Sequence, residues 1–142
     1  MKTVHIGSDH AGFGLKNFLG AELERLGFQV ADHGTNSGES CDYPGIAHEL
    51  CAQVAKTAQP GILICGTGIG MSIAANRHKD IRAALCGNEF QARMARRHND
   101  ANVLCLGARV TGTDLALAIM VAFLESSFEG GRHQRRIDAL NP

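Results

Sequence analysis

Short apolar runs alternate along this chain with longer stretches in which apolar residues recur every three or four positions. Five of the short runs have the composition of β-strands, at residues 3–7, 29–32, 61–65, 81–86 and 102–107. Several of them are continuously apolar, which is typical of parallel strands covered on both faces.

Helical patterns lie between these runs. The first helix should end before Gly27 and is predicted by four leucines at helical spacing: Leu15, Leu19, Leu23 and Leu26. Pro44 is expected to begin a second helix, with inward residues Ile46, Leu50, Val54 and Ala55. Three more helices are predicted at residues 69–78, 89–98 and 113–128.

Strands that alternate with helices predict a three-layer α/β/α, Rossmann-like domain with a five-stranded parallel sheet. We expect residues 1–142 to form a single domain, with a basic C-terminal tail at residues 129–142. In such sheets ligands bind at the carboxyl ends of the strands, so candidate chemistry is sought there.

The composition of the chain argues against several classes of protein. The 142 residues are 44% hydrophobic and 20% charged, which is usual for a globular domain. Lys and Arg number 14, as do Asp and Glu, and this balance argues against a dedicated nucleic-acid binder. The longest apolar run, residues 115–124, is half of what a membrane span needs. Five cysteines without a C-x-x-C pair argue against a disulfide framework or a zinc ribbon, and favour a reducing cytoplasm.

The sharpest feature is Cys65, which ends an apolar run and is followed by Gly66, Thr67, Gly68, Ile69 and Gly70. Glycines let backbone N–H groups converge on an anion, and a helix that begins beyond them adds to the positive field. The same field favours the thiolate form of a nearby cysteine. A tight turn with a buried cysteine is the simpler alternative, but three alternating glycines exceed what a turn needs. The dinucleotide fingerprint, the P-loop and the cysteine-phosphatase loop each lack a required residue here.

Two further candidates follow other predicted strands. Asp9 and His10 form an acid–base pair after the first run, although Ser8 or Asp9 could simply cap the first helix. Tyr43 is the one tyrosine, and on sequence alone a turn with a half-buried ring is the favoured interpretation.

Basic residues concentrate in the second half of the chain, where nine of the ten arginines lie. His98 could act as a general acid/base and Asn99 could orient a substrate hydroxyl, or Asn99 could cap a helix. If the tail is helical, Arg132 and Arg136 share a face that suits a phosphate, whereas Arg135 points elsewhere. A solvated basic terminus is the alternative. The remaining histidines and Cys51, Cys86 and Cys105 are interpreted as structural.

Together these segments resemble the type B ribose-5-phosphate isomerases, a family that includes allose- and galactose-6-phosphate isomerases. The resemblance follows the whole chain in order, through residues 7–13, 42–44, 61–76, 97–103, 107–109 and 128–133.

The resemblance implies a role for each candidate. Cys65 matches the base that moves a proton between C1 and C2, and the residues from Gly66 to Gly70 match the loop that holds the enediolate, with Thr67 beside it. His98, assisted by Asp9, matches the group that opens the furanose ring. The matched phosphate and sugar contacts are His10, Tyr43, Asn99, Arg109, Arg132 and Arg136.

The resemblance also implies a homodimer or tetramer whose sites are completed by the neighbouring subunit. It implies a phosphosugar substrate. Isomerisation of such a sugar requires no metal or redox cofactor, and the composition argues against nucleic-acid and membrane partners. Two alternatives stay open. One is a related isomerase that acts on allose 6-phosphate, galactose 6-phosphate or a tetrose phosphate. The other is a non-catalytic anion-binding module.

Overall fold

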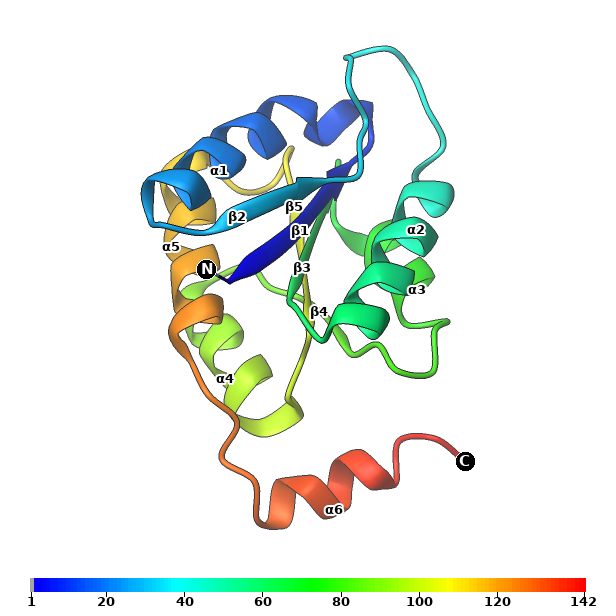
Figure 1. The fold of residues 1–142 in the computed structure, drawn as a ribbon, viewed down its shortest axis with the longest axis vertical. Coiled ribbons are helices and arrows are strands. Elements are labelled where there is room, and N and C mark those ends of the chain that lie inside the picture. Colours follow the sequence, from blue (N-terminus) through cyan, green and yellow to red (C-terminus); the bar gives the residue numbers. More distant parts are fainter. Residues whose placement is uncertain (1) are drawn as a thin grey trace.

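The computed structural model describes residues 2–142, in which strands alternate with helices (Figure 1). The strands are β1 Thr3–Ser8, β2 Gln29–Asp32, β3 Gly61–Cys65, β4 Ala83–Leu85 and β5 Val103–Gly107. The helices are the 3₁₀ turn η1 His10–Gly12, α1 Phe13–Arg25, α2 Tyr43–Thr57, α3 Ile69–Ala75, α4 Glu89–Asn99, α5 Thr113–Glu125 and α6 Arg132–Asp138. No helix in this range is long and apolar enough to cross a membrane.

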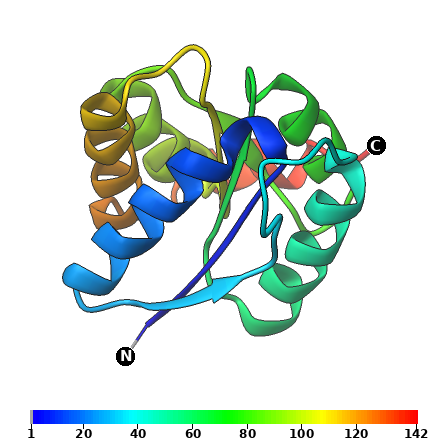
Figure 2. The same cartoon turned by 90° about the horizontal axis from the view of Figure 1, so that it is seen from above.

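All five strands pair in parallel, in the order β2-β1-β3-β5-β4. Helices α1, α4 and α5 cover one face, and α2 and α3 cover the other (Figures 1 and 2). The predicted three-layer α/β/α fold with a five-stranded parallel sheet is therefore confirmed. The direction of winding reverses between β1 and β3, so their carboxyl ends flank the switch point at which open α/β sheets bind ligands.

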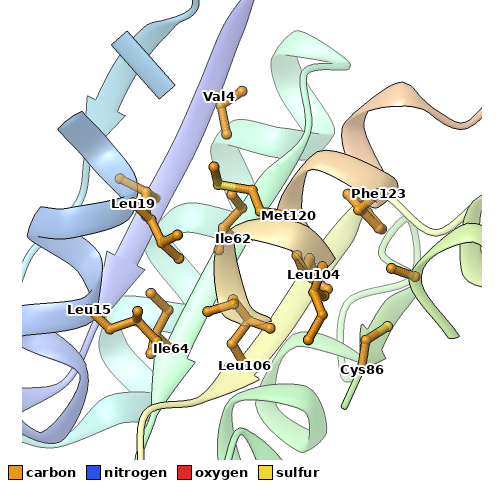
Figure 3. Close-up of a cluster of buried hydrophobic side chains, with 14 of the residues drawn as sticks. Val4, Leu15, Leu19, Ile62, Ile64, Cys86, Leu104, Leu106, Met120 and Phe123 are labelled. Atoms are coloured by element: carbon orange, nitrogen blue, oxygen red, sulfur yellow. The ribbon is translucent and has the colours of Figure 1, made fainter. Parts of the chain in front are cut away.

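The larger of two apolar clusters fills the space between the sheet and helices α1, α4 and α5. Ile62 and Leu104 face Met120 and Phe123 there, and all four are at most 1% exposed (Figure 3). Burial of such apolar side chains supplies most of the driving force for folding. Both clusters hold the strands in register, which fixes the positions of the residues at their ends.

Two predicted boundaries near β4 were wrong. The strand covers only Ala83–Leu85 rather than residues 81–86, and the backbone N–H of Arg82 donates to the Asn102 side chain at 2.9 Å instead of to a strand partner. Helix α3 ends at Ala75 rather than at 78, because the Asn76 side chain exchanges two hydrogen bonds with the backbone of Ala83, at 3.0 and 2.8 Å.

Other differences are smaller. In α2, Leu50 and Val54 are buried as predicted, but Ala55 is exposed and Ile46 is only partly buried, and Ala47 and Cys51 complete the buried face. Helix α5 ends at Glu125 rather than at 128, where the Ser126 hydroxyl bonds to the Ala122 carbonyl. The expected basic tail contains the short helix α6.

Candidate active site

Cys65 is the last residue of β3 and is only 5% exposed. The backbone N–H of Gly68 donates to its Sγ at 3.1 Å. Gly68 has a φ of +80°, a conformation that glycine adopts without strain. Thr67 Oγ1 accepts the N–H of Ile69 at 3.2 Å, where α3 begins. The glycine loop therefore turns around the thiol and directs a backbone donor at the sulfur.

The end of β5 supports this loop from the other side. A Cβ on Gly107 would lie 2.6 Å from the carbonyl carbon and oxygen of Thr67, so only glycine fits there. The Arg109 N–H donates to the Gly66 carbonyl at 2.9 Å. The Arg109 guanidinium lies 3.3 Å from where a Cβ on Gly66 would be, so a cation stands directly over the loop.

Asp9 is held next to Cys65. Its N–H donates to the carbonyl of Ile64 at 3.1 Å, and its Oδ1 accepts the N–H groups of Ala11 and Gly12 at 3.0 and 3.2 Å. The capping interpretation is thus confirmed for Asp9 at η1, and Oδ2 takes no part in these bonds. A Cβ on Gly12 would lie 2.6 Å from the Ile64 side chain, which shows how closely η1 packs on β3.

His10 and Tyr43 complete this edge. The Cys41 N–H donates to His10 Nδ1 at 3.2 Å, so a neutral His10 carries its proton on Nε2. Tyr43 is half-buried as expected, but it begins α2 rather than lying in a turn. Its ring packs on Gly70, where a Cβ would lie 2.6 Å from Cζ. One end of the sheet therefore gathers ten of the predicted site residues: Asp9, His10, Tyr43, Cys65, Gly66, Thr67, Gly68, Ile69, Gly70 and Arg109.

The other four predicted residues lie at the opposite end. His98 and Asn99 end α4, and Arg132 and Arg136 lie on α6, beyond the edge at which the strands begin (Figure 1). Five strand residues at about 3.3 Å each separate the two edges by roughly 16 Å. Asn99 does not cap α4, because the cap is Asp100, with a φ of +45°.

Sequence reasoning missed a side-chain cluster at this second end. Within residues 2–142, one group of metal-ligand type meets within 4.8 Å: His98, Glu129 and His133. Burial lowers the pKa of His133, and the charges of His98, Arg132 and Arg136 lower it further. The i,i+4 spacing of Glu129 and His133 is the one signal in the sequence, and the glycines between them obscure it.

The remaining core cysteines are poor candidates for chemistry. Burial raises the pKa of Cys51 and of Cys86 to about 11, and raises that of Cys105 well above its ordinary value. Such thiols stay protonated at neutral pH and are weak nucleophiles. All five cysteines are free. A second missed group is the hydroxyl of Ser8, which is buried at the end of β1 without a hydrogen-bond partner among the described residues.

A family model described as Ribose/Galactose Isomerase matches residues 4–140. The chain belongs to this family. It is 48% identical to ribose-5-phosphate isomerase B of Escherichia coli over 141 residues, which are 99% of this chain and 95% of the relative. The resemblance seen in the sequence is thereby confirmed, and the chain is an isomerase of the intramolecular oxidoreductase class.

Two other similar proteins carry the name of a sugar phosphate. The structure of ribose-5-phosphate isomerase B from Mycoplasma genitalium, with bound ribulose 5-phosphate, has a TM-score of 0.93 at 44% identity and covers 96% of this chain and 91% of its own. The D-erythrulose-4-phosphate isomerase of Pectobacterium atrosepticum is 41% identical over 142 residues, which are 99% of this chain and 93% of the relative.

Proposed function

We propose that this chain interconverts ribose 5-phosphate and ribulose 5-phosphate through an enediolate, with Cys65 as the base. The observation that carries the proposal is the thiol at the end of β3, enclosed by a glycine loop that directs the Gly68 N–H at it. Isomerisation requires removal of a weakly acidic C–H proton next to a carbonyl, and donors for the oxyanion that forms. Backbone N–H groups from Gly66 to Gly70, with Thr67 beside them, would supply those donors.

The ring-opening step falls to His98, assisted by Asp9 from the other end of the molecule. Aldopentose 5-phosphates are largely closed furanoses, which cannot be enolised at C2. An imidazole can take and return the proton that ring opening requires at neutral pH. Because Asp9 and His98 lie at opposite edges of one chain, they can share a substrate only across two chains. We therefore propose a homodimer, alone or within a tetramer, in which each site joins the Cys65 edge of one subunit to the His98 edge of its partner.

Phosphate and sugar contacts would come from both edges. Arg132 and Arg136 lie one turn apart on α6 and can grip the phosphate as a pair. His10 presents an N–H at Nε2 when neutral, and Arg109 adds a cation beside the loop. Tyr43 and Asn99 are the proposed sugar contacts. The route uses side chains and backbone donors throughout, and the free thiols favour the expected reducing cytoplasm.

A tetrose phosphate is the alternative substrate with specific support, since a family member at 41% identity is an erythrulose-4-phosphate isomerase. Turnover of ribose 5-phosphate, erythrose 4-phosphate, allose 6-phosphate and galactose 6-phosphate should be compared under the same conditions. The highest kcat/KM is expected for ribose 5-phosphate. A higher kcat/KM for another sugar would identify that sugar as the substrate. Binding of all four sugars without turnover would favour an anion-binding module.

The shared site has a test of its own. Cys65→Ala and His98→Asn should each be nearly inactive as pure proteins. When the two are unfolded together and refolded, half of the dimers should be hybrids, and each hybrid should contain one intact site. Recovery of about a quarter of wild-type activity is expected for an interface-shared site. If the refolded mixture stays inactive while refolded wild type recovers, the two residues do not meet across an interface.

A further inference from the structure

The imidazole of His98 does not stand alone at the end of α4. It stacks on the ring of His133, with ring centroids 4.3 Å apart and planes within 11°. The His133 side chain is 7% exposed, and its buried Nε2 has no hydrogen-bond partner among the described residues. A fixed, buried ring therefore lies flat beneath the more exposed ring of His98 and sets its plane.

Glu129 faces both rings. Its Oε1 lies 3.8 Å from His98 Nε2 and 3.5 Å from His133 Nε2. The Glu129 N–H donates to the Arg97 carbonyl at 3.0 Å, which ties the tail to the last turn of α4. A carboxylate only accepts hydrogen bonds, so an Nε2 that faces it is favoured in its protonated form. This arrangement leaves Nδ1 of a neutral His98 with the lone pair.

The same three residues are of the types that bind a divalent metal, but their geometry favours the carboxylate role. Ligand atoms of a tetrahedral ion at 2.0–2.2 Å stand about 3.3–3.6 Å apart, so the 3.8 Å between Glu129 and His98 exceeds this range, whereas the 3.5 Å between Glu129 and His133 does not. The lone pairs of two stacked, nearly parallel rings also lie in separate planes, and a shared ion needs them to converge on one point.

We propose that Glu129 and His133 are positioning residues for His98. His133 holds the plane of the ring, and Glu129 holds the Nε2–H tautomer, so that Nδ1 is the atom that exchanges protons with the sugar. This proposal rests on the ring-opening role proposed for His98 above. The arrangement has the logic of other carboxylate–histidine pairs, in which the carboxylate orients the imidazole and stabilises the imidazolium that forms.

The proton balance of the step is closed. Nδ1 of His98 takes the proton of the anomeric hydroxyl, and the electron pair left on that oxygen forms the C1 carbonyl. The C1–O4 bond breaks, and its electrons go to O4. O4 then takes the proton from the imidazolium, so that His98 returns to its starting state while Glu129 stays ionised throughout.

The test compares Glu129→Gln with Glu125→Gln, which removes the same charge at the end of α5. Two reactions are measured: turnover of ribose 5-phosphate, and exchange of the C1 protons of ribulose 5-phosphate with deuterated water. The second reaction starts from an open-chain sugar and needs enolisation only. Glu129→Gln should lower kcat for ribose 5-phosphate by about 10–100-fold, within the range of general acid–base effects. KM and the rate of deuterium exchange should change by less than about twofold. The melting temperature should change by no more than a few degrees.

Nitrogen-15 NMR gives a readout that does not depend on activity. His98 should be the Nε2–H tautomer in the wild-type protein and a mixture of tautomers in Glu129→Gln, with His133→Gln as a second variant that loosens the ring plane. An unchanged tautomer, or equal losses in both reactions, would overturn the proposal. If instead His98→Asn turns over ribose 5-phosphate normally, the ring-opening role fails, and the tautomer still decides whether Glu129 orients His98.

Discussion

The backbone N–H of Gly68 points at Cys65 Sγ across 3.1 Å, and this contact joins the end of β3 to the start of α3. The donor fixes the position of the sulfur relative to the backbone of the glycine loop. The contact depends on the left-handed backbone of Gly68, so it is a property of the folded loop.

Replacement of Cys65 should separate catalysis from binding. Cys65→Ala is expected to lower kcat by about 10²–10⁴-fold, because it removes the proposed proton acceptor, while the affinity for the sugar phosphate remains. Cys65→Ser should also be inactive, since a hydroxyl is a far poorer base. Iodoacetamide should inactivate the wild-type enzyme, and substrate should protect it. Wild-type turnover in Cys65→Ala would remove this cysteine from the mechanism.

Gly107→Ala tests whether the loop geometry itself is needed. The new Cβ would press on the Thr67 backbone, which cannot move aside as a flexible side chain could. We expect destabilisation of about 1–3 kcal/mol in urea unfolding, together with loss of turnover. Gly14→Ala on α1 is the matched control, because a Cβ there meets nothing within 4 Å. The control should gain up to about 1 kcal/mol and keep full activity.

Arginines 132, 135 and 136 of α6 should differ in their effect on substrate affinity. Arg132→Ala and Arg136→Ala should each raise KM, and each should cost about 1.5–3 kcal/mol in kcat/KM through loss of a charged hydrogen-bond partner. Arg135→Ala should change little, because Arg135 does not share their face of the helix. Steady-state kinetics with ribose 5-phosphate measures all three. Equal effects at the three positions would instead indicate a diffuse basic surface.

The stability of the fold should depend on pH through His5. Burial, and then the charge of His33, lower the pKa of His5 from its ordinary 6.5. Between that lowered value and pH 6.5 the unfolded chain binds more protons than the folded one, so stability falls as the pH drops through this window and is fully retained above it.

Urea unfolding at a series of pH values measures this slope. His5→Gln should flatten it in part, and His133, whose pKa is lowered in the same direction, should account for part of the rest. The bonds of His5 also predict its tautomer. The Thr57 hydroxyl donates to the Gln53 carbonyl, so His5 must donate from Nε2 to Thr57 and accept at Nδ1 from His33. If His5→Gln leaves the slope of stability against pH unchanged, His5 is not the source of this pH dependence.

Much of the architecture was predictable because local patterns carry it. The continuous apolar runs of β3 and β5 reflect strands that are buried on both faces. The leucine spacing of α1 reflects a helix that is buried on one face, and burial of this kind leaves a periodic signal in the sequence. The boundaries that failed depend on long-range side-chain bonds. Asn76 ends α3 by bonding to Ala83, and Arg82 stays outside β4 because its backbone N–H bonds to the Asn102 side chain. No local pattern records such partners.

The candidate site also has a part that the sequence reveals and a part that only the fold reveals. The sequence by itself determined the chemical groups, because a thiol before alternating glycines at a strand end is a local feature, and because the order of motifs matches one family. Only the tertiary structure decided which groups share an end of the molecule. Parallel strands bring Asp9 and Cys65 to one edge, while α4 runs back across the sheet and delivers His98 to the other. The meeting of His98 with Glu129 and His133 was likewise invisible in the sequence, since it depends on where the tail docks against α4.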